Sequence, residues 1–179
     1  MSNEPYRQRR SIRLKAYDYS QPGAYFVTIC TFQRQMLFGE VVNGNLQLNE
    51  YGHITQDCWH SLPDHFFTVG EDAFVVMPNH VHSVLLIHDV GATHASPLPH
   101  RPHHSGPQPR SVGAVVGAFK SAASRRINAL RHTPGTPIWQ RNYYEHVVRN
   151  DRDLERIRVY IQDNPANWQE DENNPLNLP

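Results

Sequence analysis

Two β-rich runs separated by only two residues constrain the fold more than any other feature of the sequence. Residues 73–77 (AFVVM) and 80–88 (HVHSVLLIH) flank Pro78 and Asn79. Short runs of β-branched and apolar residues favour strands, and proline followed by asparagine favours a tight turn. We therefore expect two adjacent antiparallel strands at the centre of a sheet.

Further strand signals lie on both sides of this pair. Residues 24–32 (AYFVTICTF) are typical of a buried strand, and residues 143–148 (YYEHVV) predict another. Asn43 and Gly44 stand between two short apolar runs, which is the strongest local signal for a hairpin. The sequence therefore predicts four main strands and a small hairpin insert.

Three segments carry the apolar periodicity of helices. The first covers residues 50–62 and is expected to end at Pro63, and the second covers residues 112–130 with a basic polar face. The third begins after Asn150, a good N-cap residue, and is expected to end at Pro165. The resulting order is β, hairpin, α, β, β, α, β, α. This order resembles an α+β fold, namely a ferredoxin-like βαββαβ sandwich with a central antiparallel sheet and an extra C-terminal helix.

Composition limits the environment in which such a chain works. The 179 residues contain 17 Lys and Arg and 17 Asp and Glu, and no apolar run approaches the roughly 20 residues that cross a bilayer. We expect no membrane segment and no secretion signal. The two cysteines cannot build a disulfide framework, so we expect a cytoplasmic protein whose metal chemistry, if any, uses histidine and oxygen.

His80 and His82 are candidates for a shared metal ion. They are two residues apart on an expected strand, so both side chains leave the same face of the sheet. The pair alone is weak, because 12 histidines in 179 residues give roughly 0.8 such pairs by chance. Its position directly after MPN, at the start of a strand, supplies the context.

The last expected helix offers a phenol and an amide oxygen one turn apart, on Tyr160 and Asn164. A nucleophile and a metal ligand would need this arrangement. A packed tyrosine at the core boundary and a helix-ending asparagine are the structural alternatives, and Pro165 disfavours α geometry at Asn164.

The sequence resembles the single-tyrosine HUH transposases, and most closely the bacterial REP-associated tyrosine transposases (RAYT). Four segments carry the resemblance in family order and span most of the chain. They are residues 9–31 (RRSIRLKAYDYSQPGAYFVTICT), 77–86 (MPNHVHSVLL), 111–128 (SVGAVVGAFKSAASRRIN) and 138–165 (IWQRNYYEHVVRNDRDLERIRVYIQDNP).

The resemblance implies a role for each site residue. His80 and His82 correspond to the histidines of the HUH pair, Tyr160 to the nucleophile and Asn164 to a third metal ligand, where related insertion-sequence enzymes carry glutamine. Tyr143 and Tyr144 compete with Tyr160. They rank lower because no ligand lies one helical turn away from them, and because the family tyrosine stands just before the final Asn-Pro.

The resemblance also implies a transposase-like endonuclease and strand transferase acting on single-stranded DNA. Its substrate would carry hairpin-forming palindromic repeats of the REP type, and its product would be a 5′-phosphotyrosyl link. Two imidazoles and an amide oxygen suit Mg²⁺ or Mn²⁺. Single-subunit action in this branch leads us to expect a monomer. The expected phosphate contacts are Arg9, Arg10, Arg13, Lys120, Arg125 and Arg126, for each of which a solvated surface position is the alternative.

Composition and resemblance together divide the chain into parts. Residues 1–20 form a basic arm, residues 21–168 the HUH transposase-like catalytic domain, and residues 169–179 an acidic tail. The Pro- and His-rich segment 91–110 is expected to be a mobile loop within that domain. Two other functions stay open: a non-catalytic ferredoxin-like module that binds single-stranded nucleic acid, and a metal-dependent hydrolase that uses water in place of Tyr160.

Overall fold

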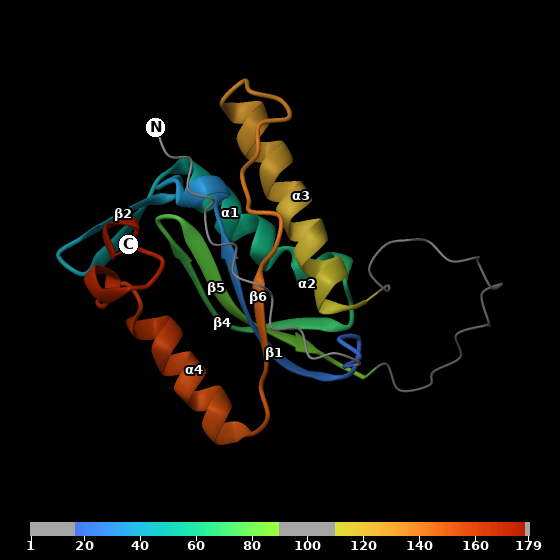
Figure 1. The fold of residues 1–179 in the computed structure, drawn as a ribbon. Coiled ribbons are helices and arrows are strands. Elements are labelled where there is room, and N and C mark those ends of the chain that lie inside the picture. Colours follow the sequence, from blue (N-terminus) through green and yellow to red (C-terminus); the bar gives the residue numbers. More distant parts are fainter. Residues whose placement is uncertain (1–16, 90–109, 178–179) are drawn as a thin grey trace, which may run out of the picture.

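The computed structural model describes residues 17–89 and 110–177 (Figure 1). The expected basic arm up to residue 16 and the expected loop up to residue 109 lie outside the described residues. So do Arg9, Arg10 and Arg13. The elements are β1 (Gly23–Cys30), β2 (Gly39–Val42), β3 (Asn45–Leu48), α1 (Glu50–His60), α2 (Leu62–His65), β4 (Val69–Met77), β5 (His80–Ile87), α3 (Val112–Leu130), β6 (Tyr144–Val147) and α4 (Asp151–Asp163). One short 3-10 turn, Phe32–Arg34, lies between β1 and β2, and two more, Trp168–Glu170 and Pro175–Asn177, lie after α4.

Four strands form one antiparallel sheet in the order β4-β5-β1-β6. Helices α1 and α3 cover one face of this sheet, and α4 lies against the other face (Figure 1). A βαββαβ chain with this strand order is a ferredoxin-like sandwich, so the predicted α+β fold with its extra C-terminal helix is confirmed.

The two central strands divide their side chains between the two faces. Val27 of β1 and Val81 of β5 belong to the main core under α1 and α3. Phe26 and Val84, their neighbours of opposite parity, belong to a smaller core with Ile157 and Ile161 of α4. This period of two places His80 and His82 on the face that carries α4, because they share the parity of Val84.

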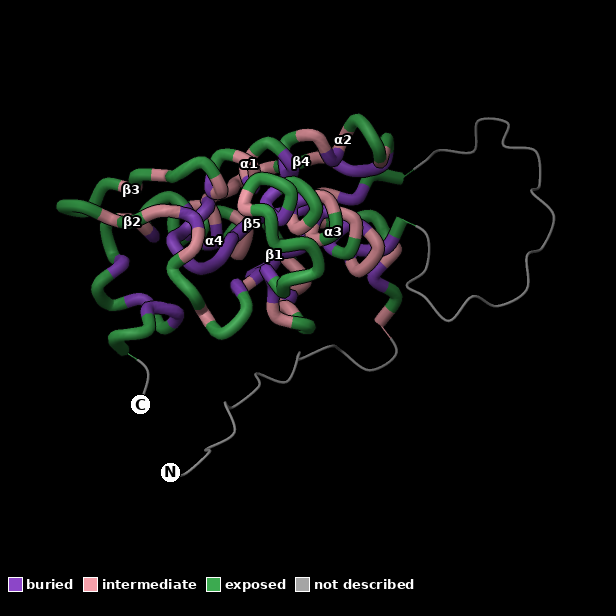
Figure 2. Tube along the Cα trace, turned by 90° about the horizontal axis from the view of Figure 1, so that it is seen from above, coloured by how far each residue is buried: buried purple, intermediate pink, exposed green. Residues whose placement is uncertain are grey.

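Local signals explain most element boundaries. Asn43 and Gly44 both adopt left-handed backbone, as a two-residue hairpin turn requires, and the hairpin projects as a largely exposed arm (Figure 2). The predicted cap of α4 is present, because the Asn150 side chain accepts a hydrogen bond from the Asp153 amide.

Several boundaries differ from the prediction by a few residues. Helix α1 ends at His60, and Pro63 lies in the first turn of the short helix α2, where a missing N–H costs nothing. Strand β4 begins at Val69, four residues before the predicted start, with an irregularity between Glu71 and Phe74. Asn164 keeps right-handed helical backbone (φ −56°, ψ −41°) although Pro165 follows it.

The segment after α4 folds back over the sheet. Trp168, Asp171, Asn173 and Asn174 are all buried, and the segment reaches the tip of the β2–β3 hairpin near Ala166 (Figure 1). Among the described residues, no helix combines the length and the apolarity that crossing a membrane requires.

Candidate active site

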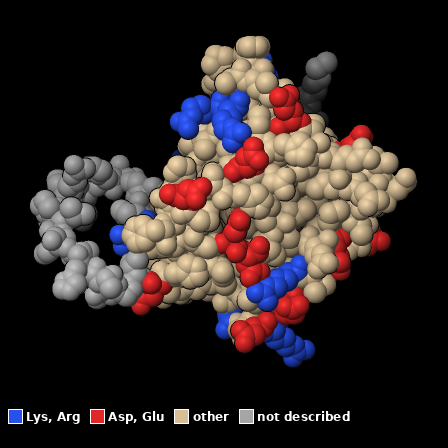
Figure 3. Space-filling view, turned by 180° about the vertical axis from the view of Figure 1, so that it is seen from behind, with Lys and Arg blue, Asp and Glu red and all other residues tan. Residues whose placement is uncertain are grey.

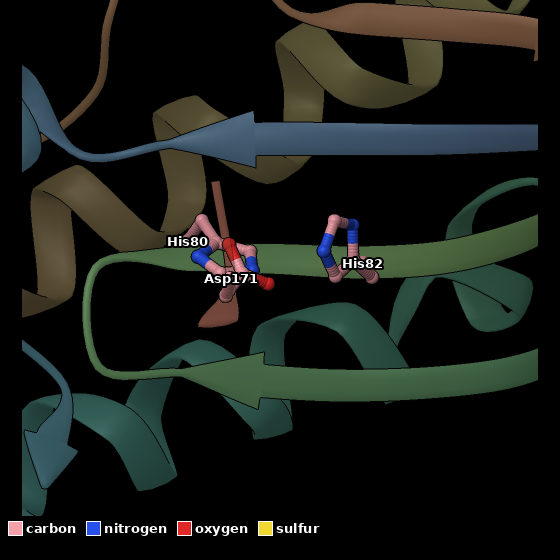
Figure 4. A group of neighbouring side chains, drawn as sticks. All are labelled: His80, His82 and Asp171. Atoms are coloured by element: carbon pink, nitrogen blue, oxygen red, sulfur yellow. The ribbon is translucent and has the colours of Figure 1, made fainter. Parts of the chain in front are cut away.

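His80 and His82 rise from β5 toward the face on which α4 and the C-terminal segment lie (Figure 4). Both rings are buried, with exposed fractions of 0% and 1%. Thr28 on β1 is the register partner of His82, and its hydroxyl lies 2.9 Å from His82 Nδ1. The neighbouring strand β1 therefore fixes the His82 ring.

The hydrogen bonds of Asn79 decide the tautomer of His80. The Asn79 amide nitrogen donates to the carbonyl oxygens of Asn173 (2.8 Å) and Arg34 (3.3 Å), so its side-chain oxygen is left as an acceptor. That oxygen lies 2.9 Å from His80 Nδ1, which must then carry the hydrogen. The lone pair of His80 is consequently on Nε2, which points away from the strand.

Burial keeps His80 neutral. Desolvation by burial, together with the positive charge of Arg34, lowers the pKa of His80 to about 3, and a hydrogen bond that the charged ring would make to the Asn164 side chain opposes this shift in part. A neutral imidazole with a free lone pair is the form that binds metal ions.

Tyr160 brings its hydroxyl to the same place from α4. Its oxygen lies 3.2 Å from His82 Nε2, and its ring meets Phe26 edge-on at 6.0 Å between centroids. The side chain is not a packed core residue, because 42% of Tyr160 is exposed. It borders a cleft of about 830 Å³ that is also lined by His82, Asn164 and Asp171.

Asn164 follows one turn later and is almost completely buried. Its amide nitrogen donates to Asp171 Oδ2 at 2.9 Å, so Asn164 Oδ1 is directed elsewhere. Among the described residues, neither Asn164 Oδ1 nor His80 Nε2 has a hydrogen-bond partner. Buried polar atoms are normally paired, so two unpaired acceptors in one site fit a metal ion.

Asp171 is the site residue that the sequence did not reveal. Ligand atoms of His80, His82 and Asp171 all lie within 4.8 Å of one another (Figure 4). The sequence pattern around Asp171 is that of a polar, acidic tail, and only Trp168, an apolar side chain three residues before it, hinted that this segment packs.

The other tyrosine candidates occupy different positions. Tyr143 packs against the main core, with the Lys120 ammonium 5.5 Å from its ring centroid. Tyr144 borders the same cleft as Tyr160 and packs against Phe26. Tyr144 is thus the competitor that shares the site, whereas Tyr143 faces the opposite side of the sheet.

The three described cations that we expected to contact DNA all belong to α3, on the face opposite the cleft. Lys120 Nζ donates to the carbonyl oxygens of residues 140, 141 and 142 at 2.9–3.3 Å. Arg126 pairs with Asp57 at 3.2 Å, and Arg125 is exposed. The structure therefore brings His80, His82, Tyr160 and Asn164 together, and it does not bring these three cations to them. On the face seen from behind, acidic and basic side chains are interspersed (Figure 3).

Known proteins resemble this chain in sequence and in fold. No protein-family model matches the chain. An uncharacterized protein of Haemophilus influenzae is 38% identical over 169 residues, which cover 92% of each chain. A solved structure of a REP-associated tyrosine transposase bound to a REP hairpin shares 17% sequence identity and gives a TM-score of 0.59. This likeness covers 85% of our chain and 72% of the other and shows a common fold. The chain therefore belongs to one family with the Haemophilus influenzae protein and has the fold of a REP-associated tyrosine transposase.

Proposed function

We propose that this protein is a transposase-like endonuclease and strand transferase that cuts single-stranded DNA by attack of Tyr160 on phosphorus. The observation that supports this most strongly is the position of the Tyr160 hydroxyl, 3.2 Å from His82 Nε2 in an open cleft. A nucleophile needs such access, because the phosphodiester must approach it in line.

A divalent cation, Mg²⁺ or Mn²⁺, belongs to the proposal. The residues that would hold it are His80, His82 and Asn164, whose nitrogen and oxygen atoms fit such an ion. When bound, the ion would polarise the scissile phosphate and offset the charge on its oxygens.

The chain's own groups carry out the exchange of bonds. The Tyr160 oxygen forms a bond to phosphorus while the bond from phosphorus to the 3′ oxygen breaks. The phenol loses its proton, and the departing 3′ oxygen takes one up. The products are a 5′-phosphotyrosyl link and a free 3′-OH. The link conserves the phosphodiester for rejoining, so no nucleotide cofactor is needed.

The proposed substrate is a single strand that carries hairpin-forming repeats of the REP type. The solved relative in fold was bound to a REP hairpin. We propose that the basic arm residues Arg9, Arg10 and Arg13 contact the phosphates of this strand. Exposed Arg125 of α3 is a candidate for a more distant contact.

The deciding experiment incubates the protein with an end-labelled hairpin-bearing single strand and Mg²⁺ or Mn²⁺. The proposal expects a covalent protein–DNA adduct that withstands denaturation and disappears with a chelator. Binding without cleavage would indicate a non-catalytic module, and cleavage without an adduct would indicate hydrolysis by water; either outcome contradicts the proposal.

A further inference from the structure

The carboxylate of Asp171 is buried without a charged partner. Only 7% of the residue is exposed, and none of the ion pairs within residues 17–89 and 110–177 includes it. Its two oxygens accept hydrogen bonds from the Asn164 amide and from the Asn173 backbone N–H. A buried charge is normally paired or bound to a metal ion, whereas both of these donors are neutral.

The atoms around Asp171 point to what compensates it. His80 Nε2 and Asn164 Oδ1 are buried, are acceptors, and have no hydrogen-bond partner within the described residues. An oxygen of Asp171 and ring nitrogens of His80 and His82 lie within 4.8 Å of one another. Acceptors that face each other repel unless a cation lies between them.

We propose that Asp171 is a direct ligand of the divalent ion and completes a donor set of two imidazoles, one amide oxygen and one carboxylate. This inference rests on the proposed metal-dependent function and adds the only charged ligand to it. A carboxylate raises affinity for Mg²⁺ and Mn²⁺ in particular, because both ions prefer hard, charged oxygen.

Asp171 lies in a segment that packs against the sheet. Its segment is attached to the sheet by the Asn79 side chain, which donates to the Asn173 carbonyl, and by Arg34, which donates to Asn173 Oδ1 at 3.0 Å. The Trp168 ring lies 6.0 Å from the His80 ring. Ion binding and docking of residues 168–174 must therefore stabilise each other, since both depend on the same carboxylate.

Calorimetric titration of the full chain with Mn²⁺, in the absence of DNA, tests the ligand assignment. Asp171→Asn should bind Mn²⁺ at least about tenfold more weakly than the unaltered protein. Glu170→Gln and Glu172→Gln are the matched controls, because both residues border the same cleft and each substitution also removes one negative charge. The Mn²⁺ affinities of these two variants should stay within about twofold of that of the unaltered protein. Equal losses of affinity in all three variants would overturn the assignment, because they would show that the general negative charge of the cleft attracts the ion.

A double-variant cycle separates a ligand from a residue that only orients Asn164. In an Asn164→Ala background there is no amide to orient, so an orienting Asp171 would have no further effect on Mn²⁺ affinity. A ligand would still lose affinity when changed to Asn, and failure to see that loss refutes the proposal.

Hydrogen exchange of the unaltered protein provides a measurement that needs no variant. Mn²⁺ should slow exchange of the backbone amides in residues 168–174, and unchanged exchange would overturn the proposal. Tyr160→Phe should retain Mn²⁺ binding. A protein that binds Mn²⁺ through Asp171 but forms no DNA adduct would therefore refute the proposed function and leave this inference standing.

Discussion

At the scale of single residues, Tyr160 is the side chain whose role can be isolated most cleanly. Tyr160→Phe keeps the ring against Phe26 and removes only the hydroxyl near His82. We predict complete loss of the covalent DNA adduct and of cleavage, with binding of the single strand unchanged. The free energy of unfolding should fall by no more than about 1 kcal/mol, because the lost hydrogen bond is partly exposed. Adduct detection by denaturing electrophoresis and a thermal melt measure the two effects.

Tyr144→Phe and Tyr143→Phe control for the choice of nucleophile. Tyr144 is the more demanding control, because it borders the same cleft. An adduct that persists in Tyr160→Phe and vanishes in Tyr144→Phe would move the nucleophile to β6.

Thr28 lines the same cleft and supports His82 from the neighbouring strand β1. Thr28→Val preserves the shape of the side chain and removes the hydroxyl 2.9 Å from His82 Nδ1. Because the partner on the far side of an imidazole fixes its tautomer and orientation, we predict about tenfold weaker Mn²⁺ binding by calorimetry. Thr55→Val is the control, since this buried hydroxyl in α1 donates to the Tyr51 carbonyl, away from the site. Equal Mn²⁺ affinities for the two variants would contradict a supporting role of Thr28.

The site residues differ in how far sequence could predict them. Strand periodicity predicts that His80 and His82 share a face, and helix periodicity predicts the same for Tyr160 and Asn164. The choice of these residues as a site comes from the resemblance to the REP-associated tyrosine transposases. Asp171 could not be predicted in this way. Its contacts with β5 join positions about ninety residues apart and arise from packing of Trp168 and Asn173, for which no local pattern exists.

At the scale of elements, the placement of α4 determines where Tyr160 stands. An ion pair between Arg158 of α4 and Asp72 of β4, with two contacts of 2.8 and 2.6 Å, joins the helix to the edge strand. Asp72→Asn should lower Tm by about 2–4 °C at neutral pH. Glu155→Gln removes the more exposed partner of the same guanidinium and should change Tm less.

The same ion pair predicts a pH dependence. The hydrogen bonds from Arg158 hold the pKa of Asp72 below its usual value. The stabilisation by this ion pair is therefore fully present above about pH 4, the pKa of an Asp side chain in the unfolded protein. It is lost as the pH falls through the lower pKa of Asp72 in the folded protein. Melts of the unaltered protein and Asp72→Asn should converge in acid, and a constant difference at all pH values would rule out this linkage.

Element boundaries show where local patterns lose their force. The residues that extend β4 at its start include Gly70 and Glu71, which are poor strand formers, yet they pair with Leu86 and Leu85 of β5. Pro63 ends the periodic pattern of α1 but begins a new short helix, because proline is favoured in a first turn. Asn164 keeps helical backbone before Pro165, and its side-chain amide nitrogen donates to Asp171.

At the scale of the whole molecule, the described structure holds α4 against its own sheet. Only residues 148–150 connect β6 to α4, and Ile157 and Ile161 pack with Phe26 and Val84 of the same chain. We therefore expect a monomer whose active tyrosine is supplied in cis. Sedimentation should show one species of the monomer mass at micromolar concentration, and an obligate dimer would contradict this expectation.

The unpaired acceptor atoms of His80 and Asn164 suit the binding of a metal ion but make folding less favourable. A buried polar atom without a partner makes folding less favourable, so these two atoms lower the stability of the protein without metal. A mutation does not simply relieve this cost, because replacing His80 removes its hydrogen bond to Asn79 and replacing Asn164 removes the one to Asp171. An ion bound to both atoms would relieve it, so the amount of folded protein in a cell should rise with the supply of that ion.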